Sequence, residues 1–130
     1  MVDVSVQGPV LHLEIRGWDK LWAFKSQFEI PLVHVKSVST LSGRGELEEM
    51  ARQLGFGIRA LGTGVPGLIA AGTFYFVRGG RVFLDVHRPF ERVLVIDLAE
   101  EPYRKLVVEV EDPEEAVRLI QGALSALASV

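Results

Sequence analysis

The sequence contains no cysteine. This absence excludes a disulfide scaffold, a thiol nucleophile, and any zinc or iron–sulfur site that depends on cysteine ligands. The chain also lacks an excess of positive charge, since 14 basic and 17 acidic residues give a formal net charge of −3. A dedicated nucleic-acid binder needs a basic surface that displaces phosphate counterions. We therefore expect no nucleic-acid partner and no attraction to an anionic membrane surface.

Long hydrophobic runs are missing as well. The longest apolar stretch, Val65 to Val77, is too short to span a bilayer and is interrupted by proline and glycine. The first residues carry neither a positive start nor an apolar segment of signal-peptide length. These observations predict a cytoplasmic protein without a transmembrane segment.

What the chain does have is enough apolar sequence for one core. Its 130 residues match the size of one ordinary domain, and 48% of them are hydrophobic. We find no internal repeat, linker or low-complexity tract. The sequence therefore predicts a single domain over residues 1–130.

Alternation of apolar and polar residues dominates the sequence before residue 112. Val2, Val4 and Val6 alternate with polar residues, and residues 11–15 repeat this period of two, which is typical of half-buried strands. Paired turn residues, Gly8-Pro9 and Gly79-Gly80, predict hairpins. Further strands are expected over residues 22–30, 32–38, 68–77, 81–87, 92–98 and 104–110.

One internal segment has helical spacing instead. Leu47, Met50, Ala51 and Leu54 follow the i, i+3, i+4, i+7 pattern, and Gly55 stands where a helix C-cap glycine would. A short helix near 45–55, inserted between strands, is therefore expected.

The last 19 residues predict a second, longer helix. Asp112 is placed to cap its N-terminus, Pro113 occupies the first helical position, and Glu115 completes a capping-box pattern. Its apolar stripe consists of Val117, Ile120, Leu124 and Leu127. Such a stripe suits packing against a sheet.

Several segments resemble a known family. Residues Phe28 to Val38 resemble the strand element I-P-L-x-x-I-x-x-V of bacterial pleckstrin-homology-like (PH-like) domains. The stretches 62–67, 71–74 and 85–87 are similar to a small group of uncharacterised bacterial proteins placed with that superfamily. The resemblance implies a mainly β (α+β) fold, in which two near-orthogonal antiparallel sheets form a PH-like barrel capped by the C-terminal helix. It implies no reaction.

The same superfamily includes eukaryotic domains that often bind phosphoinositides through a basic first hairpin loop. The corresponding loop here is Gln7-Gly8-Pro9, which has no lysine or arginine. Phosphoinositide binding is therefore not expected.

A glycine motif offers an alternative function. Gly62, Gly64 and Gly67 match the dinucleotide fingerprint G-x-G-x-x-G, and Asp85 follows the last glycine at a distance that suits a ribose-binding acid. In such sites the glycines let the backbone approach a pyrophosphate at a helix N-terminus. Residues 68–77 would have to form that helix, yet their aromatic and β-branched residues favour a strand. We therefore keep small-ligand or nucleotide binding as the alternative, and a tight bend between strands as the simpler interpretation.

Asp85 and His87 are the remaining candidates for chemistry. They lie two residues apart on one strand face, where they could ligate a metal or act as an acid–base pair. Val82, Leu84 and Val86 form the opposite face, so we interpret the face of Asp85 and His87 as a solvated outer surface. Arginines around this hairpin could hold an anion. The candidate anion or ligand contacts are Arg59, Thr63, Asp85, His87 and Arg88.

The sequence has no nucleophile elbow, P-loop or H-E-x-x-H motif. A metal site built on histidine would need His12, His34 and His87 to converge, which the sequence does not show. We therefore predict no catalytic residue, metal or cofactor. The expected function is a non-catalytic PH-like binding or interaction module that engages a protein partner or forms a homo-oligomer, because free strand edges favour pairing.

Overall fold

A computed structural model describes residues 1–16, 27–54, 57–65, 69–76, 78–87 and 89–128, with the backbone alone for 57–65 and 69–72. Nine strands, two α-helices and one 3-10 turn occur in these ranges. The strands form one three-stranded and one six-stranded sheet. The mainly β (α+β) class expected from the sequence is therefore confirmed.

The smaller sheet is an antiparallel meander in the order β1-β2-β3. Its strands are β1 (Val2–Gln7), β2 (Val10–Ile15) and β3 (Gln27–Pro31). The period of two decides which face is buried: Leu11, Leu13 and Ile15 are almost fully covered, whereas the residues between them are not. The predictions of strands at 2–6 and 11–15 are confirmed.

The larger sheet has the strand order β4-β8-β9-β7-β6-β5. Its strands are β4 (Val35–Leu41), β5 (Gly57–Val65), β6 (Ile69–Phe76), β7 (Gly80–His87), β8 (Val93–Leu98) and β9 (Lys105–Glu109). All neighbours are antiparallel except β7 and β9, which run parallel. The purely antiparallel arrangement implied by the resemblance is thus wrong at this one pair.

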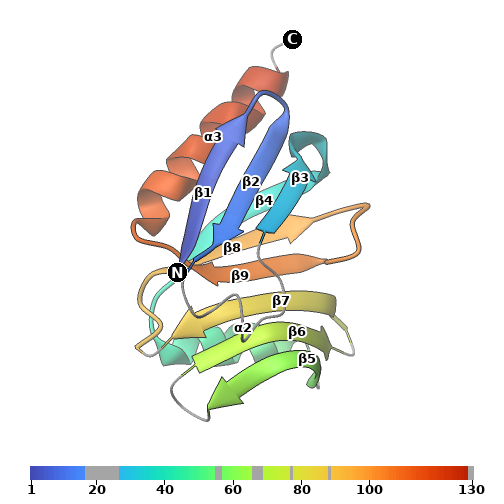
Figure 1. The fold of residues 1–130 in the computed structure, drawn as a ribbon, viewed down its shortest axis with the longest axis vertical. Coiled ribbons are helices and arrows are strands. Elements are labelled where there is room, and N and C mark those ends of the chain that lie inside the picture. The colour runs from blue at the N-terminus through green and yellow to red at the C-terminus, as the bar shows by residue number, and fades with distance from the viewer. Residues whose placement is uncertain (17–26, 55–56, 66–68, 77, 88, 129–130) are drawn as a thin grey trace.

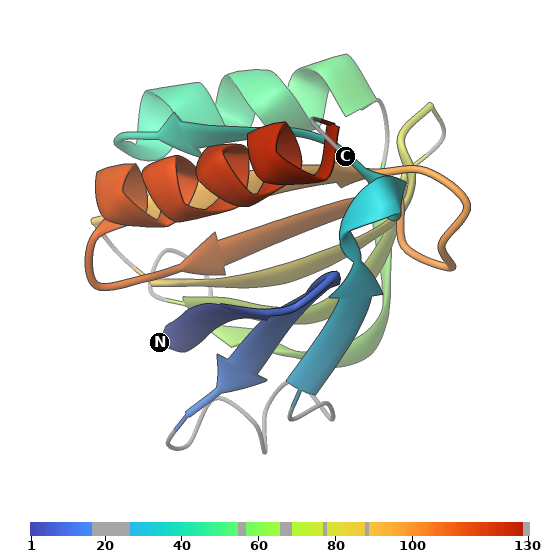
Figure 2. The same ribbon diagram turned by 90° about the horizontal axis from the view of Figure 1, so that it is seen from above.

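Helix α3 (Pro113–Ala128) and the smaller sheet cover one face of the larger sheet, and α2 (Arg44–Leu54) covers the other (Figures 1 and 2). The main core lies on the first of these faces. Phe28 from β3, Phe83 from β7 and Tyr103 from the β8–β9 connection pack edge to face there, with ring centroids 4.8–6.1 Å apart. This aromatic cluster joins the two sheets.

Both predicted helices are present. Helix α2 spans the expected segment, and its Leu47, Met50 and Leu54 pack on a second core cluster. Asp112 caps α3, since its Oδ1 accepts a hydrogen bond from the backbone N–H of Glu115 at 3.1 Å. The Glu115 carboxylate accepts hydrogen bonds from Arg118.

Two expectations about the first half of the larger sheet need correction. The strand predicted over 32–38 starts with a 3-10 turn, η1 (Leu32–His34), and β4 begins only at Val35, because the chain must cross from the smaller to the larger sheet at this point. Residues 62–65, part of the glycine motif that we interpreted as a tight bend between strands, belong instead to strand β5. The part of the strand prediction at 22–26 lies outside the described residues.

The two sheets do not close into a barrel. In the described part of the chain each sheet is an open ladder with two edges, β1 and β3 in one, β4 and β5 in the other. The strands of the smaller sheet run across those of the larger one (Figure 1). Closure implied by the resemblance is therefore wrong, and the open edges become relevant to function. Neither described helix is long and apolar enough to cross a membrane.

Candidate functional site

Asp85 does not lie on a solvated face, contrary to the interpretation from the sequence. Its side chain is completely buried in β7. It alternates with Val82, Leu84 and Val86, but it shares its face with Phe83, which belongs to the core between the two sheets. Both faces of β7 are covered, so alternation along this strand does not separate core from surface. Phe83 was the sequence signal that could have revealed this.

His87, at the end of β7, is held by an acid on the neighbouring strand. Its Nδ1 lies 2.5 Å from Oε1 of Glu109, and the two side chains are 31% and 10% exposed. Sequence reasoning missed Glu109, because 22 residues separate the pair and only the β7–β9 pairing brings them together. The arrangement joins two strand ends through a charge-assisted hydrogen bond.

The other candidate residues are distributed along β5 and beyond. The register pairs Thr63 with Ala71 and Ala71 with Asp85, so these three residues form one row across β5, β6 and β7. Arg59 pairs with Phe74, three rows away on the other side of a register shift. Arg88 lies outside the described residues. The register therefore does not gather these candidates around one point.

The glycine motif does not form a phosphate loop. Gly62 and Gly64 lie within β5, and residues 69–76 form the antiparallel partner strand β6. The strand predicted over 68–77 is thus confirmed for the described residues, and no helix N-terminus follows the glycines there. The third glycine, Gly67, lies outside the described residues.

Two of the arginines around the β6–β7 hairpin have structural contacts. The guanidinium of Arg78 donates to the backbone oxygens of Arg52 and Gln53 at 3.3–3.4 Å, at the C-terminal end of α2. Arg81 stacks over the rings of Tyr75 and Tyr103, with its Cζ 5.2 and 5.6 Å from their centroids. These contacts fasten a helix and a loop to the hairpin.

The three histidines lie on different elements, each beside its own acid. His12 in β2 lies 3.8 Å from Glu29, and His34 in η1 lies 2.5 Å from Glu101. Within the ranges that the structure describes, no group of three histidine or acidic side chains is arranged to hold a metal ion.

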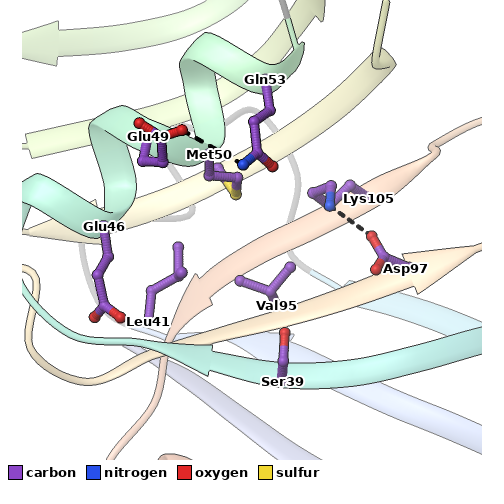
Figure 3. A pocket seen from close by; sticks show the side chains of 9 residues that line it. All are labelled: Ser39, Leu41, Glu46, Glu49, Met50, Gln53, Val95, Asp97 and Lys105. Carbon is purple, nitrogen blue, oxygen red and sulfur yellow. Dashed lines mark hydrogen bonds and ion pairs between the residues drawn. The ribbon is translucent and has the colours of Figure 1, made fainter.

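A groove lies between α2 and the β4–β8–β9 part of the larger sheet (Figure 3). We call it the α2 groove, and its volume is about 270 Å³. It is lined by Ser39, Leu41, Glu46, Glu49, Met50, Gln53, Val95, Asp97 and Lys105. No sequence pattern indicated it, because its walls come from a helix and three strands that only the fold brings together.

Polar contacts organise one side of this groove. Lys105 Nζ lies 2.6 Å from Asp97 Oδ1, and Ser37 Oγ donates to the other oxygen of Asp97 at 2.8 Å. On α2, Glu46 accepts the backbone N–H of Ser42 and Glu49 pairs with Arg52. The acids of the helix and the Asp97–Lys105 pair therefore line the same groove from different elements, with Leu41, Met50 and Val95 beside them (Figure 3).

Both ends of α2 are fixed to neighbouring loops. At the C-terminal end, the backbone N–H groups of Arg78 and Gly79 donate to the Leu54 oxygen at 2.9 and 3.1 Å. At the N-terminal end, the Gly43 N–H donates to the Phe90 oxygen at 2.6 Å. These bonds satisfy terminal groups of the helix and set its position over the groove.

Two surface arginines have altered acidity. A hydrogen bond to Asp3, together with the charge of Asp3, raises the pKa of Arg16 above its ordinary value. Glu115 raises the pKa of Arg118 in the same way. Both arginines are cations at any physiological pH, so these shifts contribute no titrating group.

Comparison of the chain with models of protein families, with curated proteins and with solved structures found no match.

Proposed function

We propose that the protein is a non-catalytic PH-like interaction module that associates with a second copy of itself through strand β5. The observation that carries this proposal is the position of β5 at the end of the six-stranded sheet. One side of this strand pairs with β6 from Gly57 to Val65, with a register shift between Arg59 and Leu61. The backbone N–H and C=O groups on its other side point away from the sheet, which is the arrangement that accepts a further strand.

The other three edges are shorter or protected. Strand β3 has five residues and ends in Pro31, which cannot donate a ladder hydrogen bond. Strands β1 and β4 carry Asp3 and Lys36, and α3 packs against both. Strand β5 has nine residues, of which Arg59 alone is charged and none is proline. It therefore lacks the proline and the short length that protect other edges, and its irregularity is a register shift between Arg59 and Leu61.

A second copy is the partner that this edge fits most simply. Most soluble homo-oligomers are two-fold symmetric, and a strand can pair with its own copy in antiparallel fashion. Pairing centred on Leu61 would place Arg59 of one copy opposite position 63 of the other, so the two arginines would not face each other. Like charges directly opposite would disfavour such a pair.

The PH-like assignment is supported by the motif resemblance and by the order of elements, in which strands precede one C-terminal helix. A closed barrel would leave β5 no free edge. The proposed association therefore depends on the sheets being open at β5.

Light scattering at several protein concentrations tests the proposal. We expect the wild-type chain to form a dimer, and we expect a proline in β5 to abolish it. The N–H groups of successive residues in a strand point to opposite edges of that strand. Of the two variants Thr63→Pro and Gly64→Pro, one therefore removes a hydrogen bond to β6. The other removes an N–H group on the outer edge alone. Circular dichroism and thermal unfolding identify which variant keeps the wild-type fold.

The outer-edge variant should be a folded monomer. A wild-type monomer at every concentration would overturn the proposal, and so would a dimer that persists in the folded proline variant. Conversion of this folded variant to a monomer would support β5 as the interface.

A further inference from the structure

We propose that the α2 groove binds a small aliphatic cation, an ammonium group carried by a short hydrocarbon chain. The site goes beyond the proposed self-association, because the strands beneath it, β4, β8 and β9, form the opposite half of the larger sheet from β5. An experiment that disproves ligand binding in the α2 groove therefore leaves the β5 interface untested, and the reverse also holds.

The floor of the groove suits a hydrocarbon chain. Leu41, Met50 and Val95 line it from three different elements (Figure 3). Val95 is almost fully buried, and Met50 has an unbranched thioether side chain that adapts to the shape of a neighbour. Ligand pockets commonly combine such an apolar surface with a few convergent polar groups.

The charged side chains around the floor favour a ligand of positive charge. Three carboxylates line the groove, on Glu46, Glu49 and Asp97, against the single ammonium of Lys105. Lys105 already neutralises Asp97 at 2.6 Å. Arg52 pairs with Glu49 at the same distance, so Glu46 is the lining carboxylate for which the described residues show no basic partner. It leaves the groove with a net negative charge, and a cleft lined by one sign of charge concentrates ions of the other sign.

The glutamates can accept another donor. Glu46 accepts one backbone N–H. Glu49 pairs with Arg52, which is itself 72% exposed, and accepts a hydrogen bond from the Gln53 amide at 3.5 Å. An ionised carboxylate offers about four acceptor positions, so both retain capacity for a ligand ammonium. None of the residues of α2 is fully buried, so these side chains stand at the open rim.

The volume limits the size of the ligand. The groove has a volume of about 270 Å³, which is room for a small molecule. A chain of five methylenes with an amine at each end fits this space. A folded protein segment would need a larger surface.

Cadaverine, a diamine of this length, is the probe. It is titrated into the full-length protein and followed by amide chemical shifts, with valerate and pentanol as matched probes that lack the positive charge. We expect saturable shifts confined to α2, β4, β8 and β9 with cadaverine. The uncharged and anionic probes should cause smaller shifts at the same millimolar concentrations.

Two glutamates on α2 provide a charge-matched control. Glu46→Gln removes the groove carboxylate that has no basic partner among the described residues, whereas Glu48→Gln removes one that pairs with Arg44 and does not line the groove. We expect Glu46→Gln to raise the dissociation constant about three- to five-fold, the size of one exposed charge contact. Glu48→Gln should change it much less, although the net charge is the same.

A steric variant tests the floor independently of charge. Ser39 is exposed and lines the groove, so Ser39→Ile should fill the space and abolish the shifts. Thr40→Ile, at the next exposed position of β4, does not touch the groove and should bind normally. Lack of saturation, equal binding of valerate, equal effects of the two glutamine variants, or unaltered binding in Ser39→Ile would each overturn the proposal.

Discussion

Gly79 and Leu54 approach each other so closely that no side chain fits between them: a Cβ atom on Gly79 would lie 2.3 Å from Leu54 Cδ2. The contact joins the β6–β7 hairpin to the C-terminal end of α2, where the Gly79 N–H also donates to the Leu54 oxygen. We expect Gly79→Ala to destabilise the protein by about 1–3 kcal/mol, because the helix end must shift to make room.

Urea unfolding of Gly79→Ala beside Gly45→Ala measures this effect. Gly45 lies in α2 with open space around the position of its Cβ, so alanine there should be neutral or stabilise by about 0.5–1 kcal/mol. Equal stability of the two variants would show that the hairpin does not hold the helix in the described position.

Ile120 anchors α3 in the main core, whereas its neighbour Leu119 faces solvent. Ile120 is 0% exposed and Leu119 is 42% exposed. We expect Ile120→Ala to cost about 2–5 kcal/mol through the cavity it leaves, and Leu119→Ala to cost about 0.5 kcal/mol or less. Thermal and denaturant unfolding of both variants would check this difference, and a small effect at Ile120 would contradict the packing of α3 on the sheets.

The His87–Glu109 contact contributes to stability through a nearly buried carboxylate. Removing the imidazole in His87→Ala leaves Glu109, 10% exposed, without this hydrogen bond. A loss of about 1–3 kcal/mol is expected. The matched variant His12→Ala removes a contact of 3.8 Å to a glutamate that is 61% exposed, and its cost should be about 0.5 kcal/mol or less. Similar losses in both would mean that burial of Glu109 is unimportant.

Asp112 determines where α3 begins. Its side chain accepts the Glu115 N–H at 3.1 Å, so Asp112→Ala should destabilise the protein by about 1 kcal/mol. Asp112→Ser keeps a capping oxygen and should restore most of this loss. Circular dichroism during unfolding would follow both variants, and a serine variant as unstable as the alanine one would argue against the cap.

Sequence patterns located most elements because these depend on local chemistry. The alternation over 2–15 and the capped segment after Asp112 each bury one face, so their periods match the observed burial. Strand β5 was missed because its glycines carry no alternation signal. Its pairing with β6 compensates for this weak propensity.

The candidate sites depended more on tertiary structure. Asp85 and His87 stood out in the sequence, yet burial makes the first a core residue and Glu109 engages the second. The α2 groove could not be predicted from the sequence. Its walls come from separate elements, and the sequence of one element does not show which other element packs opposite it.

The sequence by itself determined the mainly β class, the two helices and the positions of most strands, because propensity, alternation and capping act between residues close along the chain. Only the tertiary structure decided that β7 is covered on both faces, that β9 pairs with it in parallel, and that β5 is an edge strand among the described residues. These features follow from contacts between distant segments, whose packing is settled by the burial of apolar surface across the whole molecule.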